Sequence, residues 1–306
     1  MPVSPLHAPL LDWYAAHARD LPWRQPGVSA WDVLVSEVML QQTPVARVLP
    51  VWLEWTARWP TAAALAAEAP GEAVRAWGRL GYPRRALRLH AAAVVVTEQH
   101  GGELPDELAA LRTLPGVGAY TAAAVLSFAH GRRHAVLDTN VRRVLARVGD
   151  GVENAGPSAT AAEYARAEAL LPDDPGEAAR WAVATMELGA LVCTARAPRC
   201  SECPVADACR WRAAGYPAAQ TQARRPQAFA GTDRQVRGRL MAVLRTASEP
   251  VPRDLLDEAW HLPEQRERAL AALAADGLAS ELPDGRWCLP GTHGPAAAGV
   301  APAGAG

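Results

Sequence analysis

The chain has 306 residues, half of them apolar, and a formal net charge of −1 at pH 7. A chain of this length can bury a sizeable core in one large domain or in two to three smaller ones. No run of about 18 apolar residues without a charge occurs, which excludes a transmembrane helix. The N-terminus lacks a basic segment followed by an apolar one, so we expect no secretory signal and a cytoplasmic location.

All 31 of the Lys and Arg residues in the chain are arginines, so the chain contains no lysine. A mechanism that needs a lysine Schiff base is therefore excluded, and only the terminal amine could substitute. The arginines form three clusters, which are either patches that grip phosphates or solvated helix faces. The clusters are Arg79, Arg84, Arg85 and Arg88; Arg132, Arg133, Arg142, Arg143 and Arg147; and the arginines from Arg224 to Arg239.

Residues Leu10 to about Ala214 show a helical pattern. Apolar positions recur at spacings of three and four, with short Pro and Gly breaks between the runs. Much of the apolar content is alanine, which favours helix over sheet. We therefore predict a mainly α-helical core that spans residues 1–217.

Glu37 lies in an apolar helical segment that we expect to end near Thr43, with Thr43 as the N-cap of a helix opened by Pro44. Burial among apolar neighbours would raise the pKa of the carboxyl and let it hold a proton near neutral pH. The alternative is an exposed helix glutamate. The apolar neighbours are Leu34, Val38 and Leu40.

A glycine-containing turn, Leu114-Pro115-Gly116-Val117-Gly118, separates two predicted helices at 105–112 and 119–129. The two glycines let the backbone turn tightly and present N–H groups at a helix start, which suits a phosphate. The alternative is a plain helix–helix turn.

Asp138 follows the extended segment Ala135–Leu137 and precedes a helical segment, Val141–Val148. A carboxylate in this position is either a helix N-cap or a functional group at the end of an extended segment.

Four of the five cysteines lie close together in sequence, at Cys193, Cys200, Cys203 and Cys209. Four such thiolates can surround one metal centre. A disulfide framework is not expected in a cytosolic chain. A zinc site would normally use two C-x2-C pairs, and only one is present, so the spacing favours [4Fe–4S] over zinc. We expect the fifth, Cys288, to be an ordinary core thiol.

The C-terminal part begins with a polar segment at 218–231 that we predict to be a linker. Residues 232–290 form a compact pattern of three helices and a hairpin around Asp284-Gly285, typical of a winged helix. Residues 291–306 are rich in Gly, Ala and Pro, and we expect a disordered tail. The predicted helices are Val236–Leu244, Pro252–Ala259 and Pro263–Asp276.

The cysteine spacing and the upstream glycine turn resemble the endonuclease III and MutY superfamily of DNA glycosylases. Ser36–Thr43 is similar, nearly letter for letter, to the signature of the adenine glycosylase branch, and Leu21–Arg24 and Met186–Ala190 are similar to that branch too. The resemblance covers about residues 8–215. It implies a two-lobed helix-hairpin-helix core with a [4Fe–4S] loop at 193–209, acting on double-stranded DNA, and we expect a monomer.

Two features separate the branches of this superfamily. The bifunctional endonuclease III branch has a catalytic lysine where this chain has Tyr120, so a lysine-based lyase is excluded. The thymine-mismatch branch also has a tyrosine there but lacks the acid that corresponds to Glu37. The resemblance therefore implies a monofunctional base excision repair enzyme that removes adenine mispaired with 8-oxoguanine or guanine. The alternatives are a glycosylase for thymine or uracil opposite guanine, and a DNA-binding or redox-sensing protein with structural carboxylates.

The resemblance implies four catalytic roles. Cleavage of an N-glycosidic bond needs an acid for the leaving base and an anion for the sugar cation. Glu37 would protonate adenine at N7, and Asp138 would stabilise the sugar cation or trap it covalently. Tyr120 and Asn140 would orient the two carboxylates.

The resemblance also implies residues that bind substrate and DNA, each of which has an ordinary structural alternative in the core or on the surface. The adenine pocket would consist of Trp23, Arg24, Leu40 and Glu187. The residues that enter the helix beside the opposing guanine would be Gln41, Gln42 and Tyr82. The hairpin contacts to the DNA backbone would come from Leu114, Gly116, Val117 and Gly118. The cluster loop would meet phosphates through Arg196, Arg199, Arg210 and Arg212.

Residues 232–290 depart from the family pattern. Many adenine glycosylases have a C-terminal domain that resembles the Nudix fold and inspects 8-oxoguanine, but this segment is too short and too helical. It could bind duplex DNA through Arg234, Arg237 and Arg239, bind a repair protein, or only pack against the core.

Overall fold

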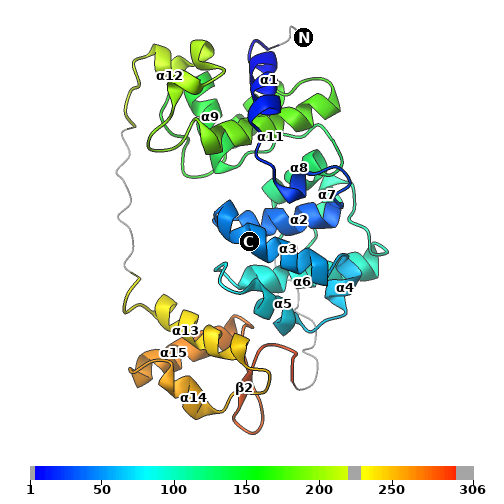
Figure 1. Cartoon of the computed structure of the whole chain (residues 1–306), viewed down its shortest axis with the longest axis vertical. Coiled ribbons are helices and arrows are strands. Elements are labelled where there is room, and N and C mark those ends of the chain that lie inside the picture. The colour runs from blue at the N-terminus through cyan, green and yellow to red at the C-terminus, as the bar shows by residue number, and fades with distance from the viewer. Residues whose placement is uncertain (1–3, 220–228, 294–306) are drawn as a thin grey trace. The chain divides into compact units, whose positions relative to one another are not determined.

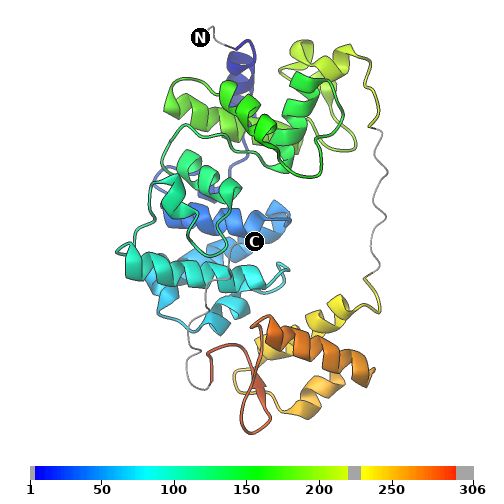
Figure 2. The same cartoon turned by 180° about the vertical axis from the view of Figure 1, so that it is seen from behind.

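The computed structural model describes residues 4–219 and 229–293 (Figure 1). In these residues the protein is mainly α-helical, with one short two-stranded sheet, as both views show (Figure 2). This confirms the predicted fold class. Arg224, Arg225 and most of the predicted linker and tail lie outside the described residues. Within the described ranges, no helix has the length and apolar character needed to span a membrane.

The chain divides into two compact units, and the division falls inside helix α2 (Ala30–Leu40), directly after Glu37. Of the described residues, the first unit contains 4–37, 105–113 and 117–219. The second unit contains 38–104, 114–116 and 229–293.

The first unit has a helical core centred on α11 (Pro175–Leu191), against which α1 (His7–His17) and α9 (Thr139–Leu145) pack. Leu10 and Leu188 are almost fully buried in it. Its other helices are η1 (Pro22–Arg24), α7 (Leu108–Leu111), α8 (Ala119–Phe128), the π-helix η2 (Ala146–Asp150), α10 (Ala161–Ala169), η3 (Cys200–Glu202), η4 (Ala206–Ala208) and α12 (Arg210–Ala213).

Local sequence signals explain where the helices of the first unit begin. At α11, Asp174 is the N-cap and accepts a hydrogen bond of 2.8 Å from the N–H of Glu177, with Pro175 at the first helical position. At α10, Thr160 and Glu163 form a reciprocal capping box. These caps satisfy N–H groups that a helix start otherwise leaves unpaired.

The second unit is built around α3 (Val45–Arg58), α5 (Pro70–Trp77) and α6 (Arg84–Gln99), with the short α4 (Ala62–Ala66) against α6. Trp55, Trp59 and Trp77 are among its most deeply buried side chains. Trp55 makes edge-to-face contacts with Trp59 and Trp77, at centroid distances of 4.7 and 5.7 Å. Such pairs contribute about 0.5–1.5 kcal/mol beyond the area they bury.

The C-terminal residues of the second unit contain three helices and a hairpin, in the order that the sequence predicts. Val251 extends the hairpin by pairing with Trp287. The domain boundaries themselves stay a prediction. The elements are α13 (Asp233–Thr246), α14 (Arg253–Glu258), α15 (Pro263–Ala275), β1 (Ser280–Glu281) and β2 (Trp287–Cys288).

The segment after α2 differs from the prediction. The helix ends at Leu40, and Pro44 rather than Thr43 is the N-cap of α3. The hydroxyl of Thr43 instead accepts a hydrogen bond of 3.0 Å from the Arg85 guanidinium. The expectation of a Thr43 cap was therefore wrong, because a tertiary contact uses the hydroxyl that the sequence assigned to the next helix.

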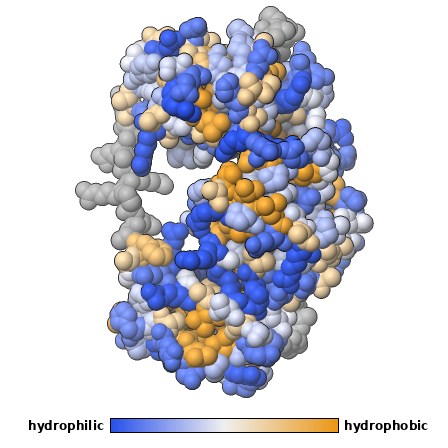
Figure 3. All heavy atoms as spheres, viewed as in Figure 1, coloured by the Kyte–Doolittle hydropathy of each residue, from blue (hydrophilic) through white to orange (hydrophobic). Residues whose placement is uncertain are grey.

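The surface is mixed in character. On the face drawn in Figure 3, hydrophilic residues predominate and apolar residues lie in patches between them. Among the large apolar side chains that are exposed are Tyr82 and Phe229, at 52% and 55%.

Candidate active site

Glu37 lies on α2 and is only 6% exposed, so its reading as an exposed helix glutamate is wrong. Its Oε2 accepts a hydrogen bond of 2.8 Å from the hydroxyl of Tyr120, in the first turn of α8. Burial raises the pKa of Glu37 to about 7, although the Tyr120 hydrogen bond opposes this. The charge of Asp138 raises the pKa further, and Arg24 lowers it. The carboxyl can therefore hold a proton near neutral pH.

Asp138 is the N-cap of α9, as the alternative reading proposes. Its Oδ1 accepts a hydrogen bond of 2.6 Å from the N–H of Val141, and its Oδ2 accepts one of 2.7 Å from Asn140 Nδ2. Burial raises the pKa of Asp138, while these hydrogen bonds lower it. Each carboxylate oxygen has two lone pairs and uses one of them in these hydrogen bonds, so each oxygen keeps a lone pair that can stabilise a developing cation.

Arg143 holds Asn140 in place and links it to α11. One amino group, Nη2, donates to Asn140 Oδ1 at 2.8 Å and to the carbonyl of Gly189 at 2.7 Å. Its Nε donates to the carbonyl of Cys193 at 2.8 Å. A Cβ on Gly189 would lie 2.7 Å from Asn140 Cβ and 2.9 Å from its carbonyl oxygen. The close approach of α11 to the start of α9 therefore requires glycine at this position.

Glu187 is fully buried on α11 and is bound by two arginines of the N-terminal segment. Arg19 pairs with it through Nε and Nη2, both at 2.7 Å, and Arg24 Nη2 lies 2.9 Å from Oε2. Burial acts to raise the pKa of Glu187, but the arginine contacts outweigh it and lower the pKa to about 2. Arg24 Nη1 is buried without a hydrogen-bond partner among the described residues. The buried Trp23 precedes it.

Leu40, Gln41, Gln42 and Tyr82 all belong to the second unit. Gln42 and Tyr82 both have left-handed backbones, with φ of +53° and +47°. For residues with a side chain this conformation costs roughly 1–2 kcal/mol, and such strain concentrates at functional sites. Tyr82 is 52% exposed, so its alternative reading as a core residue is wrong.

The buried side chain of Arg85, on α6, connects the end of α2 with the turn that contains Tyr82. Its Nη2 donates to Thr43 Oγ1 and to the carbonyl of Gly81, both at 3.0 Å. Its Nη1 donates to three carbonyls, which a helix end leaves unpaired. These belong to Val38, Met39 and Gln41, at 2.8, 3.1 and 2.6 Å.

The glycine turn has one residue that requires glycine. Gly116 has φ of +81°, whereas Gly118 is extended, with φ −88° and ψ 179°. The expectation that both glycines make the turn was therefore wrong for Gly118. Leu114 and Val117 are buried, so only their backbones can reach a ligand. Among the described residues, the N–H groups of residues 116, 117 and 118 have no hydrogen-bond partner.

The arginine cluster from Arg132 to Arg147 is mostly engaged inside the first unit. Arg142 pairs with Glu163 at 2.8 Å, and Arg147 is 1% exposed. This cluster is therefore not a surface patch for phosphates.

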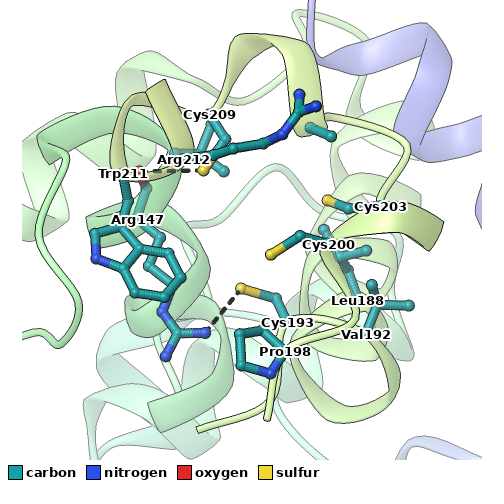
Figure 4. A pocket seen from close by; sticks show the side chains of 12 residues that line it. Arg147, Leu188, Val192, Cys193, Pro198, Cys200, Cys203, Cys209, Trp211 and Arg212 are labelled. Atoms are coloured by element: carbon teal, nitrogen blue, oxygen red, sulfur yellow. Dashed lines mark hydrogen bonds between the residues drawn. The ribbon is translucent and has the colours of Figure 1, made fainter. Parts of the chain in front are cut away.

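The four cysteines of residues 193–209 line one hollow, and Figure 4 shows their side chains around it. All four are half-buried free thiols, whereas Cys288 is buried in the C-terminal part, as predicted for a core thiol. Among the described residues, no three His, Cys, Asp or Glu side chains converge closely enough to hold a single metal ion.

Arg147 makes the hollow suitable for an anionic cluster. Its guanidinium lies 4.5 Å from the ring centroid of Trp211, and Nη1 lies 3.4 Å from Cys193 Sγ. Within the described part of the chain, its partners are carbonyls and this sulfur, with no carboxylate. A buried cation without an acid is costly, and an iron–sulfur cluster bound by four thiolates would supply the negative charge.

The comparisons with known proteins agree with this geometry. Residues 35–169 match the family described as HhH-GPD superfamily base excision DNA repair protein. Residues 193–209 match the iron-sulfur binding domain of endonuclease III. An adenine DNA glycosylase of Mycobacterium tuberculosis is 55% identical to this chain, over 92% of each.

The chain belongs to the adenine DNA glycosylase family. A human adenine DNA glycosylase is 42% identical, over 69% of this chain and 40% of its own length. The structure of a thermostable thymine-DNA glycosylase is similar in fold, with a TM-score of 0.61 and 28% identity, over 67% of this chain and 94% of the other. The cofactor of the chain is a [4Fe–4S] cluster, and the matched iron-sulfur segment runs from Cys193 to Cys209.

The sequence reasoning missed two arginines. Arg19 forms the shorter ion pair with Glu187, and Arg85 was noted only as a member of a basic cluster. Arg19 stands five residues before Arg24, the last residue of the segment Leu21–Arg24 that resembles the family. This proximity was the only sequence feature that could have indicated a role for Arg19. For Arg85 no signal existed, because its Nη1 donates to backbone carbonyls more than 40 residues earlier.

Proposed function

We propose that the chain hydrolyses the N-glycosidic bond of adenine mispaired with 8-oxoguanine or guanine in duplex DNA, as a monofunctional enzyme of base excision repair. The observation that carries the proposal is the buried Glu37, bonded to Tyr120 and with a pKa of about 7. An acid with this pKa suits protonation of a leaving base at neutral pH.

Glu37 is the general acid. It transfers its proton to N7 of the extruded adenine, and the electron pair of the C1′–N9 bond moves onto the base as the bond breaks. Tyr120 holds the carboxyl in position from α8. Because no lysine exists in the chain, the reaction does not continue by a lysine Schiff base.

Asp138 stabilises the sugar cation that forms when the base leaves. Its two hydrogen bonds fix the carboxylate at the start of α9 and leave lone pairs available. Water then adds to C1′ and gives a proton to the Glu37 carboxylate, which restores the acid. It attacks the sugar cation directly, or it displaces the Asp138 carboxylate where a covalent bond to C1′ has formed.

The resemblance to the family assigns Trp23, Arg24, Leu40 and Glu187 to the adenine pocket. The support is clearest for Arg24, since its buried Nη1 has no partner in the described residues and can donate to a ring nitrogen of adenine. Arg19 keeps Glu187 ionised, so that it can accept a hydrogen bond from the exocyclic amine.

DNA is bound at two further places. The unpaired N–H groups of the hairpin at 116–118 bind a backbone phosphate, as helix N-termini and backbone nests do. Gln41, Gln42 and Tyr82 enter the helix beside the opposing base and fill the gap that adenine leaves. Extrusion of a base costs a few kcal/mol, least at a mispair, which supplies part of the selectivity.

Single-turnover release of adenine tests the proposal. The substrates are duplexes with adenine opposite 8-oxoguanine, guanine or thymine, and the proteins are wild type, Glu37→Gln and Glu98→Gln. Glu98 is an exposed helix glutamate and serves as the matched control. We expect release from both mispairs by wild type and Glu98→Gln, and loss of at least about 100-fold in Glu37→Gln.

Two outcomes would overturn the proposal. Release of thymine or uracil opposite guanine, without adenine release, would indicate a glycosylase for another base. Tight binding to mispaired DNA with no base released by the wild type would indicate a DNA-binding protein whose carboxylates are structural.

A further inference from the structure

Helix α13 begins beside the turn that contains Tyr82, within the second unit. The guanidinium carbon of Arg234, in the first turn of α13, lies 5.5 Å from the ring centroid of Tyr82. It also lies 5.9 Å from the ring centroid of Phe229, which precedes the helix. Arg234 is therefore placed between two exposed aromatic side chains.

Several contacts hold α13 in this position. Asp276, after α15, pairs with Arg84 of α6 at 3.2 Å and with Arg237 of α13. Arg75 Nη1 of α5 donates to the carbonyl of Ala247 at 2.7 Å. The N–H of Gly71 donates to the carbonyl of Pro290 at 2.7 Å. The start of α13 is thus fixed to the same helices that present Tyr82.

The charge of Arg234 is not neutralised by its surroundings. Arg234 is exposed, and among residues 4–219 and 229–293 its side chain has no ion pair and no hydrogen bond. The neighbouring Asp233 is already engaged by Gln265 and Arg268. Arg234 is therefore a cation held on an aromatic surface and available to an anionic partner.

We propose that Arg234 is a DNA contact of the C-terminal part, which binds the phosphates of the strand opposite the extruded adenine. The inference rests on the proposed function, in which Tyr82 enters the helix beside the opposing base. A cation 5.5 Å from that ring lies within reach of the same strand. Residues 232–290, which stand where other adenine glycosylases have a Nudix-like domain, thereby add affinity for DNA beside the opposing base. They do so by binding the DNA backbone and not the base.

The chain contains a matched control in Arg239, on the same helix. Arg239 is also exposed, and its guanidinium carbon lies 5.9 Å from the ring centroid of Trp260, not beside Tyr82. Within the described residues it too has no ion pair. The two arginines thus differ mainly in which aromatic side chain they lie against.

The first experiment measures binding of the full-length chain to an adenine:8-oxoguanine duplex at several salt concentrations. Arg234→Ala, Arg234→Lys and Arg239→Ala are each made in a Glu37→Gln background, which prevents base release during the measurement. We expect Arg234→Ala to raise Kd several-fold and to reduce the slope of log K against log salt by about 1, the value for one lost phosphate contact. Arg234→Lys should retain the slope, and Arg239→Ala should match the parent.

A second experiment locates the contact on one strand. Neutral methylphosphonates replace the phosphates beside the opposing base, or those at the same distance from the adenine on its own strand. Replacement on the strand of the opposing base should weaken binding by the parent but not by Arg234→Ala. Replacement on the adenine strand should weaken binding by the two proteins equally.

Equal affinity and slope for Arg234→Ala and Arg239→Ala would overturn the proposal and leave this surface to a protein partner. A strand pattern opposite to the expected one would also overturn it. Failure of this proposal can be distinguished from failure of the proposed function. Adenine release is measured separately, with the same arginine substitutions in a chain that keeps Glu37, and the binding comparison does not depend on release.

Discussion

The hydroxyl of Tyr120 donates a hydrogen bond of 2.8 Å to Glu37 Oε2, and this bond joins the start of α8 to the middle of α2. Burial raises the pKa of Glu37, whereas this hydrogen bond lowers it, and the balance lies at about 7. The pair therefore sets the protonation state of the proposed acid at the pH where the enzyme would act.

Base release should depend on pH through Glu37. Because the acid must be protonated, the single-turnover rate should be constant below about 7 and fall about tenfold per pH unit above it. Tyr120→Phe removes a contact that lowers the pKa, so the break in its pH profile should move to higher pH. A break at the same pH in wild type and Tyr120→Phe would contradict this assignment.

The same carboxyl should make folding stability depend on pH. The pKa of Glu37 is raised from 4.5 in the unfolded chain to about 7. Its contribution is therefore fully present below about 4.5 and lost as pH rises through about 7. Glu37→Gln should be more stable than wild type above pH 7, by on the order of 3 kcal/mol at most. Thermal unfolding between pH 5 and 8 tests this, and Glu98→Gln should show no such crossover.

Gly189→Ala should damage the site through Asn140. The added Cβ would lie 2.7 Å from Asn140 Cβ, so α9 must shift and the hydrogen bond to Asp138 is disturbed. We expect a loss of stability of about 1–3 kcal/mol and slower release with little change in Kd for the duplex. Gly238→Ala on α13, where a Cβ meets nothing within 4 Å, should be neutral or slightly stabilising. Equal behaviour of the two variants would contradict the role of the close approach.

Arg85→Lys should impair extrusion of adenine more than its hydrolysis. A lysine keeps the charge but cannot make the planar set of contacts that joins the end of α2 to the carbonyl of Gly81. Release should fall strongly when adenine faces 8-oxoguanine, and much less when it faces an abasic site, where the gap is already open. An equal loss on both duplexes would mean that Arg85 has a general structural role, which unfolding temperatures would also reveal.

Cys203→Ser should remove iron and Cys288→Ser should not. Cys203 lines the hollow shared by the four cysteines, whereas Cys288 is buried in the C-terminal part. Without the cluster, the positive charge of Arg147 stays buried without an anion, so the first unit should lose stability. Iron content per chain and thermal unfolding measure both effects. Full iron content in Cys203→Ser would contradict the assignment.

The sequence determined those parts of the protein that depend on local pattern. Helical periodicity predicted the mainly α fold, the cysteine spacing favoured the cluster over zinc, and the missing lysine excluded a Schiff base. The apolar residues around Glu37 indicated that its carboxyl could be buried, because neighbours three positions away share a helix face, and left an exposed glutamate as the alternative. These inferences needed only contacts within one segment or chemistry that belongs to a residue type.

Only the tertiary structure decided which distant groups meet. The partners of Arg85 Nη1 are backbone carbonyls, which every residue has, so no side-chain pattern predicts them. The pairing of Arg19 with Glu187 joins residues 168 positions apart. The placement of Arg234 beside Tyr82 also joins two residues that lie far apart in the sequence. Long-range packing also overrode the local rule at Thr43, whose hydroxyl binds Arg85 instead of capping a helix. The local sequence shows which kinds of group a side chain can bond. The tertiary structure determines which of many chemically equivalent partners comes within about 3 Å of it.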